Sequence, residues 1–323
     1  MAVIECIELT KEYGKGVVAL NNVTFKIEEG TSFGLLGENG AGKSTLVRIL
    51  MGFIHPTSGR VRVLGEERVM QAHGRIGYIH ERPIFETSFT GKAYLHYLGE
   101  LAGLWERENT QRITSVLEMV HLHEAADRPI GIYSKGMLQR LAIAQALIAR
   151  PELLIMDEPT SGLDPRSQWE VKRIIQVLRE QGITILLCSH YLAEIEELCD
   201  SVGILRRGQL ILSGSVADLL RTQGIVEIVL GGPVPAREIA QRLHITQDVI
   251  EARSNVLHIK DSAQSAILAK LIAENIPIVS LNPVSQTLEE VYVRTTQAGS
   301  SSQGPEIKVP AYISGDGESI TRG

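Results

Sequence analysis

Strand-like and helix-like stretches alternate along the first two thirds of the chain. Residues 4–9 and 23–27 alternate apolar and polar positions, which predicts half-buried edge strands. Residues 153–156 and 183–188 are nearly continuous apolar runs, as in central strands that are covered on both faces. Because helical stretches separate these runs, the pattern predicts an α/β fold with a mainly parallel central sheet and an antiparallel β edge.

Two later regions depart from this alternation. Residues 85–149 have helical periodicity almost throughout, which predicts an all-helical insert. After Gly224 the segments follow the order βαββαβ, which predicts a small α+β domain of the ferredoxin-like kind, and a final stretch rich in Gly, Ser and Pro predicts a disordered tail. The sequence therefore divides into a main domain, a C-terminal domain and a tail, at residues 1–222, 223–295 and 296–323.

The composition excludes several classes of protein. Of 323 residues, 44% are hydrophobic and 22% charged, which is typical of a chain that folds around a core. The 32 basic and 38 acidic residues leave a net charge of −6, which argues against binding nucleic acid through bulk charge. We find neither a signal peptide nor an apolar run of the roughly 20 residues that span a bilayer. Cys6, Cys188 and Cys199 are far apart, so we expect reduced thiols in a cytosolic protein.

A glycine-rich segment carries the sharpest chemical signal. Residues 37–44 match G-x-x-x-x-G-K-[ST], between a predicted strand at 32–36 and a predicted helix at 42–51. Glycines let backbone N–H groups surround phosphate oxygens, Lys43 supplies a charge for the β- and γ-phosphates, and Ser44 offers a hydroxyl to Mg²⁺. A chance match is expected in about one random chain in a hundred. The residues expected to bind the nucleotide here are Gly37, Glu38, Asn39, Gly40, Ala41, Gly42, Lys43, Ser44 and Thr45.

Two further strand ends carry polar groups with possible catalytic roles beside Lys43. Asp157 ends an apolar strand and is expected to be a second oxygen ligand for Mg²⁺. Glu158, expected on the opposite side of that strand, is suited to orient a water for attack on the γ-phosphate. His190 follows the strand at 183–188 and can donate a hydrogen bond to the γ-phosphate. A solvated turn at Asp157 and a structural histidine are the alternatives.

One segment narrows the class of nucleotide enzyme. Residues 133–140 read Tyr-Ser-Lys-Gly-Met-Leu-Gln-Arg, which resembles the signature motif of ATP-binding cassette (ABC) ATPases, normally Leu-Ser-Gly-Gly-Gln. An ordinary helix cap at Ser134 is the alternative, and both can hold because a capped helix N-terminus is itself an anion site. In this family the motif contacts ATP bound to a partner subunit. The corresponding residues here are Ser134, Lys135, Gly136 and Met137.

The resemblance covers about residues 3–220 and assigns roles to other positions. Tyr13 is similar to the family's adenine-stacking aromatic, and Val18 would pack beside the base. Glu81 lies in the Q-loop, where the family more often has Gln, and would join Ser44 and Asp157 around Mg²⁺. The family's D-loop, which touches the partner subunit, is matched by Ser161, Gly162, Leu163 and Asp164.

The resemblance implies that residues 1–222 are an ABC ATPase domain using ATP and Mg²⁺. It also implies a head-to-tail homodimer or heterodimer, bound to a separate integral-membrane permease on the cytoplasmic face of the membrane. Because residues 225–295 look like the accessory domain of exporter ATPases, an exporter is expected. A soluble ABC ATPase acting on nucleic acid or ribosomes and a P-loop kinase or switch are the alternatives. Soluble ABC ATPases of this kind usually have two cassettes, a long coiled-coil insert or a basic surface. None of these features appears in this sequence, so we expect no nucleic-acid partner.

Overall fold

A central sheet organises the main domain in the computed structural model, which describes residues 1–298. Its strands lie in the order β5-β6-β7-β3-β8-β9, and all neighbours are parallel except the antiparallel edge pair β8–β9. Their bounds are β5 (Ile76–Ile79), β6 (Leu153–Asp157), β7 (Thr184–Ser189), β3 (Ser32–Leu36), β8 (Ser201–Arg206) and β9 (Gln209–Ser215). The predicted mainly parallel sheet is therefore present.

Strand β6 shows how the sheet is covered on both faces. Leu153 and Ile155 belong to one hydrophobic core, whereas Leu154 and Met156 belong to the core on the other face. Successive side chains of a strand point to opposite faces, so a strand buried on both sides must be apolar throughout. This explains the continuous apolar run in the sequence.

The N-terminal strands form a sheet of their own rather than an edge of the central one. The antiparallel order is β2-β1-β4, with bounds β1 (Ala2–Tyr13), β2 (Val17–Glu28) and β4 (Ser58–Val63). Strand β1 is therefore a middle strand, not the predicted edge strand. Its inward residues Ile4, Cys6 and Leu9 pack in the same core as helix α1 (Lys43–Leu50). The alternating pattern indicates that one face of the strand is buried, but it does not indicate which sheet the strand joins.

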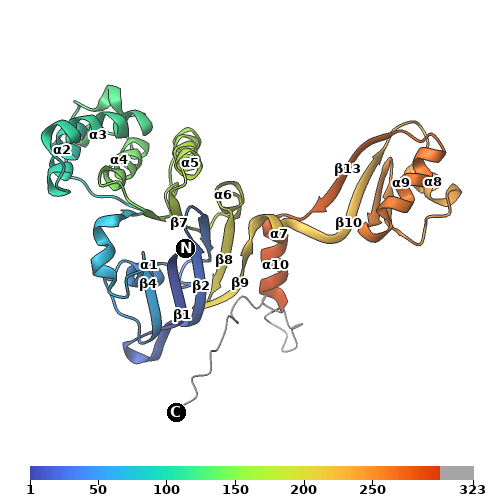
Figure 1. Ribbon diagram of the computed structural model, residues 1–323, viewed down its shortest axis with the longest axis horizontal. Helices are drawn as coiled ribbons and strands as arrows, with labels where there is room; N and C mark the ends of the chain where they lie inside the picture. Colours follow the sequence, from blue (N-terminus) through green and yellow to red (C-terminus); the bar gives the residue numbers. More distant parts are fainter. Residues whose placement is uncertain (299–323) are drawn as a thin grey trace, which may run out of the picture.

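Helices cover the opposite face of the central sheet. The segment between β5 and β6 contains α2 (Gly91–Leu101), α3 (Glu106–Met119) and α4 (Lys135–Ile148), which lie together at one end of the molecule (Figure 1). Helices α5 (Pro165–Glu180) and α6 (Leu192–Leu198) contribute to the same core. Among the described residues, no helix is long and apolar enough to cross a membrane.

The C-terminal part has its own sheet, core and helices. Its antiparallel strands lie in the order β11-β12-β10-β13, and it projects away from the main domain (Figure 1). The elements are β10 (Arg221–Leu230), α8 (Ala236–Arg242), β11 (Val249–Arg253), β12 (Val256–Lys260), α9 (Gln264–Ala273) and β13 (Ile278–Ser285). Buried residues from these strands and helices form a separate core, which includes Ile228, Leu257 and Leu271.

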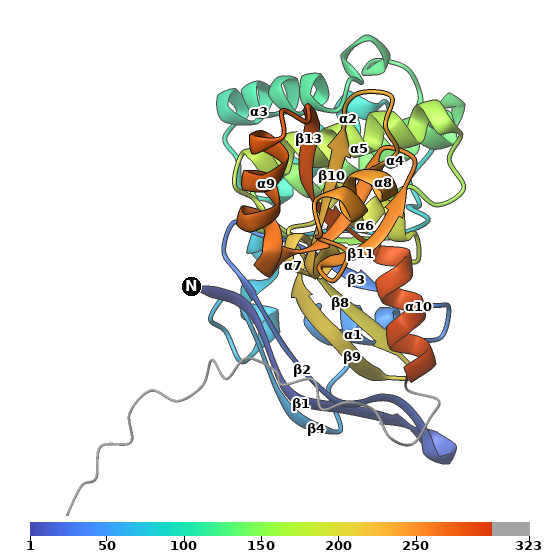
Figure 2. The same ribbon diagram turned by 90° about the vertical axis from the view of Figure 1, so that its right-hand side faces the viewer.

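The last helix returns to the main domain. Helix α10 (Leu288–Ala298) lies beside β8 and β9 and packs on α6 and on α7 (Val216–Leu220) (Figure 2). Its Leu288 and Val291 are buried in the core of the main domain. The division of the sequence at 223–295 placed Leu288 and Val291 in the C-terminal domain. In the structure, the apolar face of α10 packs on the main domain instead. The predicted tail overlaps the end of α10, and from residue 299 onward it lies outside the described residues.

Candidate functional site

The loop at residues 37–42 joins β3 to the N-terminus of α1 and needs glycine at both ends. Gly42 has φ +113°, and a Cβ there would lie 2.5 Å from the carbonyl oxygen of Ala19. A Cβ on Gly37 would lie 2.6 Å from the carbonyl oxygen of Leu205. Neighbouring backbone therefore holds this loop from two sides, which fixes its N–H groups at the start of the helix, where an anion binds well.

A cavity of about 200 Å³ opens beside this loop. The predicted adenine-stacking Tyr13 lies nearby, with its hydroxyl 3.5 Å from Thr45 Oγ1. Val18 is exposed, and its neighbour Ala19 lines the cavity in its place. The lining residues are Ala19, Glu38, Asn39, Gly40, Gly42, Lys43, Ser44, Thr45, Glu81, Asp157 and Glu158.

Lys43 is buried at the base of this cavity. Its amine donates to the carbonyl oxygen of Gly37 and, at 3.5 Å, to that of Glu38. It also lies 3.4 Å from Glu158 Oε1. A buried ammonium needs such partners because its desolvation is costly. The three contacts hold the charge beside the loop that is expected to bind phosphate.

Glu158 connects Lys43 to His190. Glu158 Oε2 lies 2.7 Å from His190 Nδ1, and because a carboxylate only accepts, Nδ1 carries the proton. Its other oxygen, Oε1, is buried and has no hydrogen-bond partner among the described residues. Besides its 3.4 Å ion pair with Lys43, this oxygen can still accept a hydrogen bond from water. His190 is thus placed beside the proposed base.

The expectation that Glu158 and Asp157 lie on opposite sides of the strand is wrong. Both carboxylates line the same cavity. The reason is the backbone of Glu158, whose φ of +50° is left-handed and interrupts the alternation of β6. Its N–H still donates to the carbonyl oxygen of Cys188 at 2.9 Å, so the strained turn is anchored to the adjacent strand β7.

Burial raises the pKa of Asp157 above its ordinary value, and the negative charge of Glu158 raises it further. Electrostatic interactions with His80 and Lys43 lower the pKa of Asp157, and the interaction with Glu81 raises it. Two acidic groups side by side in a partly closed cavity repel each other when both are ionised. A cation between them would relieve that repulsion.

Three predicted metal ligands line this cavity. They are the hydroxyl of Ser44 and the carboxylates of Asp157 and Glu81. Oxygen donors of this kind suit Mg²⁺, which usually keeps several waters and binds through one or two carboxylates. Glu81 is more exposed than Asp157, and its carboxylate lies 3.6 Å from Arg82 Nε. The donor set therefore fits magnesium.

The signature segment lies elsewhere and is tied to the D-loop of the same chain. Ser134 caps α4 by accepting from the N–H of Met137 at 3.2 Å. The amine of Lys135 donates to the carbonyl oxygens of Ser161 and Gly162, at 2.9 Å each. Lys135, which stands where the usual signature has Gly, thus makes two specific contacts.

Helices α4 and α5 meet closely next to these contacts. A Cβ on Gly136 would lie 2.3 Å from Ser167 Oγ, so only glycine fits there. Asp164 caps α5, accepting from the N–H groups of Arg166 and Ser167 at 3.1 Å, and Leu163 is buried beneath. Among the described residues, no signature or D-loop residue lines the cavity at Lys43. The structure therefore gathers the predicted residues into two separate groups.

Sequence reasoning missed two polar residues next to the site. Glu194 of α6 is buried between Thr160 and Ser189, and the only local signal was an acid on the apolar side of a helix. Tyr292 of α10 donates to Glu38 Oε1 at 3.2 Å, across 254 positions of the chain. No local pattern indicates that second contact.

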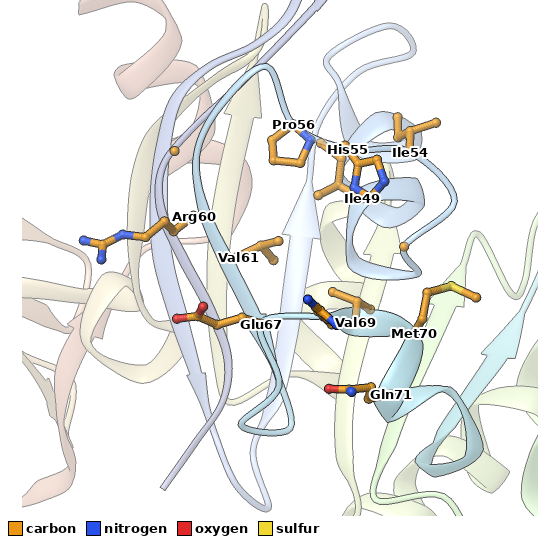
Figure 3. Close-up of a pocket in the computed structure, with 13 residues that line it drawn as sticks. Ile49, Ile54, His55, Pro56, Arg60, Val61, Glu67, Val69, Met70 and Gln71 are labelled. Carbon is orange, nitrogen blue, oxygen red and sulfur yellow. The ribbon is translucent and has the colours of Figure 1, made fainter.

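A larger, mostly apolar pocket of about 700 Å³ lies at the other end of α1 (Figure 3). It is formed between the end of that helix, β4 and the 3₁₀ segment η2 (Val69–Arg75). Met70, which is 64% exposed, borders it. Its other labelled lining residues are Ile49, Ile54, His55, Pro56, Arg60, Val61, Glu67, Val69 and Gln71.

Comparisons with known proteins agree with the family resemblance. Residues 20–161 match the family model described as "ABC transporter". An uncharacterised ABC transporter ATP-binding protein of Synechocystis is 38% identical over 303 residues, covering 90% of this chain and 84% of the relative. The Nod factor export ATP-binding protein I of Sinorhizobium fredii is 36% identical over 257 residues, covering 76% and 75%.

Solved structures share the fold. CbiO1 of Clostridium perfringens, part of the ABC transporter complex cbiONQ, is similar with a TM-score of 0.63 and 29% identity. The match covers 68% of this chain and 90% of that one.

Proposed function

This chain belongs to the ATP-binding proteins of the ABC transporter family, and we propose that it powers export through a separate membrane-spanning subunit. It is an ATPase, as ABC cassettes are. Export is supported by the Nod factor export protein among its relatives. A location on the cytoplasmic face of the membrane follows from that role. We also assign the C-terminal domain to the ferredoxin-like kind, from the strand order 2-3-1-4 of its βαββαβ chain.

The observation that carries the proposal is the separation of the two groups of nucleotide-binding residues. Lys43, Asp157 and Glu158 share one cavity, whereas Ser134 and Lys135 are exposed on another part of the surface. A site that needs both groups requires a second chain. We therefore propose a head-to-tail dimer in which the signature segment of one subunit closes over ATP bound to the other.

The residues of the cavity support in-line hydrolysis. Lys43 and the N–H groups of the loop would bind the triphosphate, and Glu158 Oε1 would accept a proton from the attacking water. His190, hydrogen-bonded to Glu158, would hold that carboxylate in place and contact the γ-phosphate. Mg²⁺, held by Ser44, Asp157 and Glu81, would neutralise charge on the phosphates.

The surface suited to the membrane subunit lies away from ATP. The apolar pocket between α1, β4 and η2 would offer a groove for a short cytoplasmic helix of the permease (Figure 3). Met70, which is more than half exposed, would gain burial there. ATP-driven closing and opening of the dimer would move this groove.

A pull-down from solubilised membranes tests the proposal. We expect the full chain to recover a hydrophobic, multi-spanning polypeptide, and Met70→Asp to reduce that recovery while the purified variant still binds ATP. The control is a protein extended by one Asp at Met1, an exposed methionine away from the pocket. It carries the same added charge as Met70→Asp. Recovery of soluble proteins alone, or turnover stimulated steeply by nucleic acid and sensitive to salt, would contradict it.

A further inference from the structure

A buried carboxylate lies directly behind the catalytic pair and takes no part in the steps proposed above. Glu194 of α6 is 2% exposed. Its Oε1 accepts from Thr160 Oγ1 at 2.8 Å, and its Oε2 accepts from Ser189 Oγ at 2.5 Å. The two donors come from different turns, one after β6 and the other at the end of β7.

These two turns carry the residues that act on ATP. Thr160 follows Glu158 by two positions, and Ser189 immediately precedes His190. Both hydroxyl-bearing residues are buried, so neither has water as an alternative partner. One carboxylate therefore bridges the two turns through their side chains, in addition to the backbone hydrogen bond from Glu158 to Cys188.

The turn at His190 is held from both sides. Ser189 Oγ donates to Glu194 and accepts from the N–H of Tyr191 at 3.0 Å. The ring of Tyr191 in turn packs on the imidazole of His190, with centroids 3.9 Å apart. Fixing Ser189 thus fixes the backbone on both sides of His190.

We propose that Glu194 is a positioning residue for hydrolysis, which holds Glu158 and His190 in register across the two strand ends. The pair is 2.7 Å apart, and Glu158 is in a strained left-handed conformation that a looser turn would not maintain. Burial costs the ionised form of Glu194 free energy, and the two hydroxyl donors offset part of that cost. This role of Glu194 rests on the hydrolytic roles proposed for Glu158 and His190, and it does not depend on export.

Steady-state ATP hydrolysis by the full chain tests this positioning role. For Glu194→Ala we expect kcat to fall about 10- to 100-fold, with little change in KM or in the affinity for a fluorescent ATP analogue, because a misplacement of about 1 Å is enough for such a loss. Glu194→Gln should recover most of the activity, since an amide can accept from one hydroxyl and donate to the other.

Two sets of variants separate positioning from general stability. Thr160→Val and Ser189→Ala each remove one side of the bridge and should each lower kcat. Glu197→Gln is the matched control, since this acid is on the same helix but exposed and paired with Lys172 at 2.7 Å. It should leave kcat unchanged.

Wild-type kcat in Glu194→Ala would overturn the proposal. So would a folded Glu194→Gln that is as inactive as the alanine variant, or a loss of nucleotide affinity parallel to the loss of kcat. A wild-type chain that binds nucleotide but never hydrolyses it would instead count against the proposed function.

Discussion

Lys43 and Glu158 are buried and touch each other through their side chains, whereas Ser134 and Lys135 are exposed and act through a helix cap and backbone contacts. Lys43, Glu158 and His190 form a chain of contacts of 3.4 and 2.7 Å. Among residues 1–298, the hydrogen bonds of the Ser134 and Lys135 side chains go to backbone groups, at 2.9–3.2 Å.

This difference separates two tasks. The first group is organised before any partner arrives, because buried charges need their counterparts within the same chain. The second keeps polar groups at the surface, where a second subunit would contact them in the proposed dimer. Substitutions in the first group should therefore affect chemistry, and those in the second should affect cooperation between subunits.

The largest effect is expected for Glu158→Gln. An amide cannot accept the proton of the attacking water, so turnover should fall by about 10²- to 10⁴-fold, while ATP still binds. Size-exclusion chromatography with MgATP should show a persistent dimer. Hydrolysis at the parental rate would show that the base has been assigned to the wrong residue.

Ser134→Ala should come next and should act on the other group. Removal of one donor to a phosphate commonly lowers turnover by about 10²-fold, and here nucleotide affinity of the isolated subunit should not change. Thr90→Ala is the control, because Thr90 caps α2 in the same way, accepting from Ala93 N at 3.1 Å. Both variants lose a cap worth about 1 kcal/mol, but only the first should lose cooperative hydrolysis.

Lys135→Met should have a smaller effect of the same kind. It removes two hydrogen bonds to the D-loop, each at an exposed position, so we expect about a tenfold loss of turnover, equivalent to about 1.4 kcal/mol. The dependence of rate on protein concentration should become steeper. Lys172→Met removes a surface amine from α5 and is the control; if it reduces turnover equally, the contact with Ser161 and Gly162 is not the cause.

Asp157→Asn should stabilise the protein without Mg²⁺ at neutral pH. Burial and Glu158 raise the pKa of Asp157, so the folded state binds its proton more tightly than the unfolded state does. Stability is therefore lost as the pH rises from the ordinary value of about 3.9 through the raised pKa. We expect a melting temperature about 2 °C higher for the variant at pH 7, with the gain shrinking as the pH falls through that window. An unchanged difference across the pH range would contradict this.

The smallest effect is expected for Tyr292→Phe. This change removes a single, partly exposed hydrogen bond to Glu38, worth about 1 kcal/mol, and so should raise KM for ATP only a few-fold. Val293→Ala, at an exposed neighbouring position of α10, is the control. Equal KM values in both variants would mean that α10 does not influence the phosphate-binding loop.

Several strands of the fold were not predicted, for reasons specific to their residues. Strand β5 has four residues, and β4 is mostly exposed, so neither gives a strong pattern. Strand β8 is interrupted by Gly203, where a Cβ would lie 2.9 Å from the ring of Phe33. Glycine weakens a strand pattern, yet this position admits nothing larger. Contacts between distant parts of the chain decide such strands.

The spacing of residues along the chain was enough to predict the glycine-rich loop, the buried strands of the central sheet and the place of the helical insert between two strands. Those features depend on periodicity and on backbone conformations that neighbouring residues dictate. Only the folded chain could place Glu158 on the same side as Asp157, return α10 to the main domain and bury Glu194 behind Glu158 and His190. Each of these depends on a contact between segments that are remote in sequence, and local patterns carry no information about such partners.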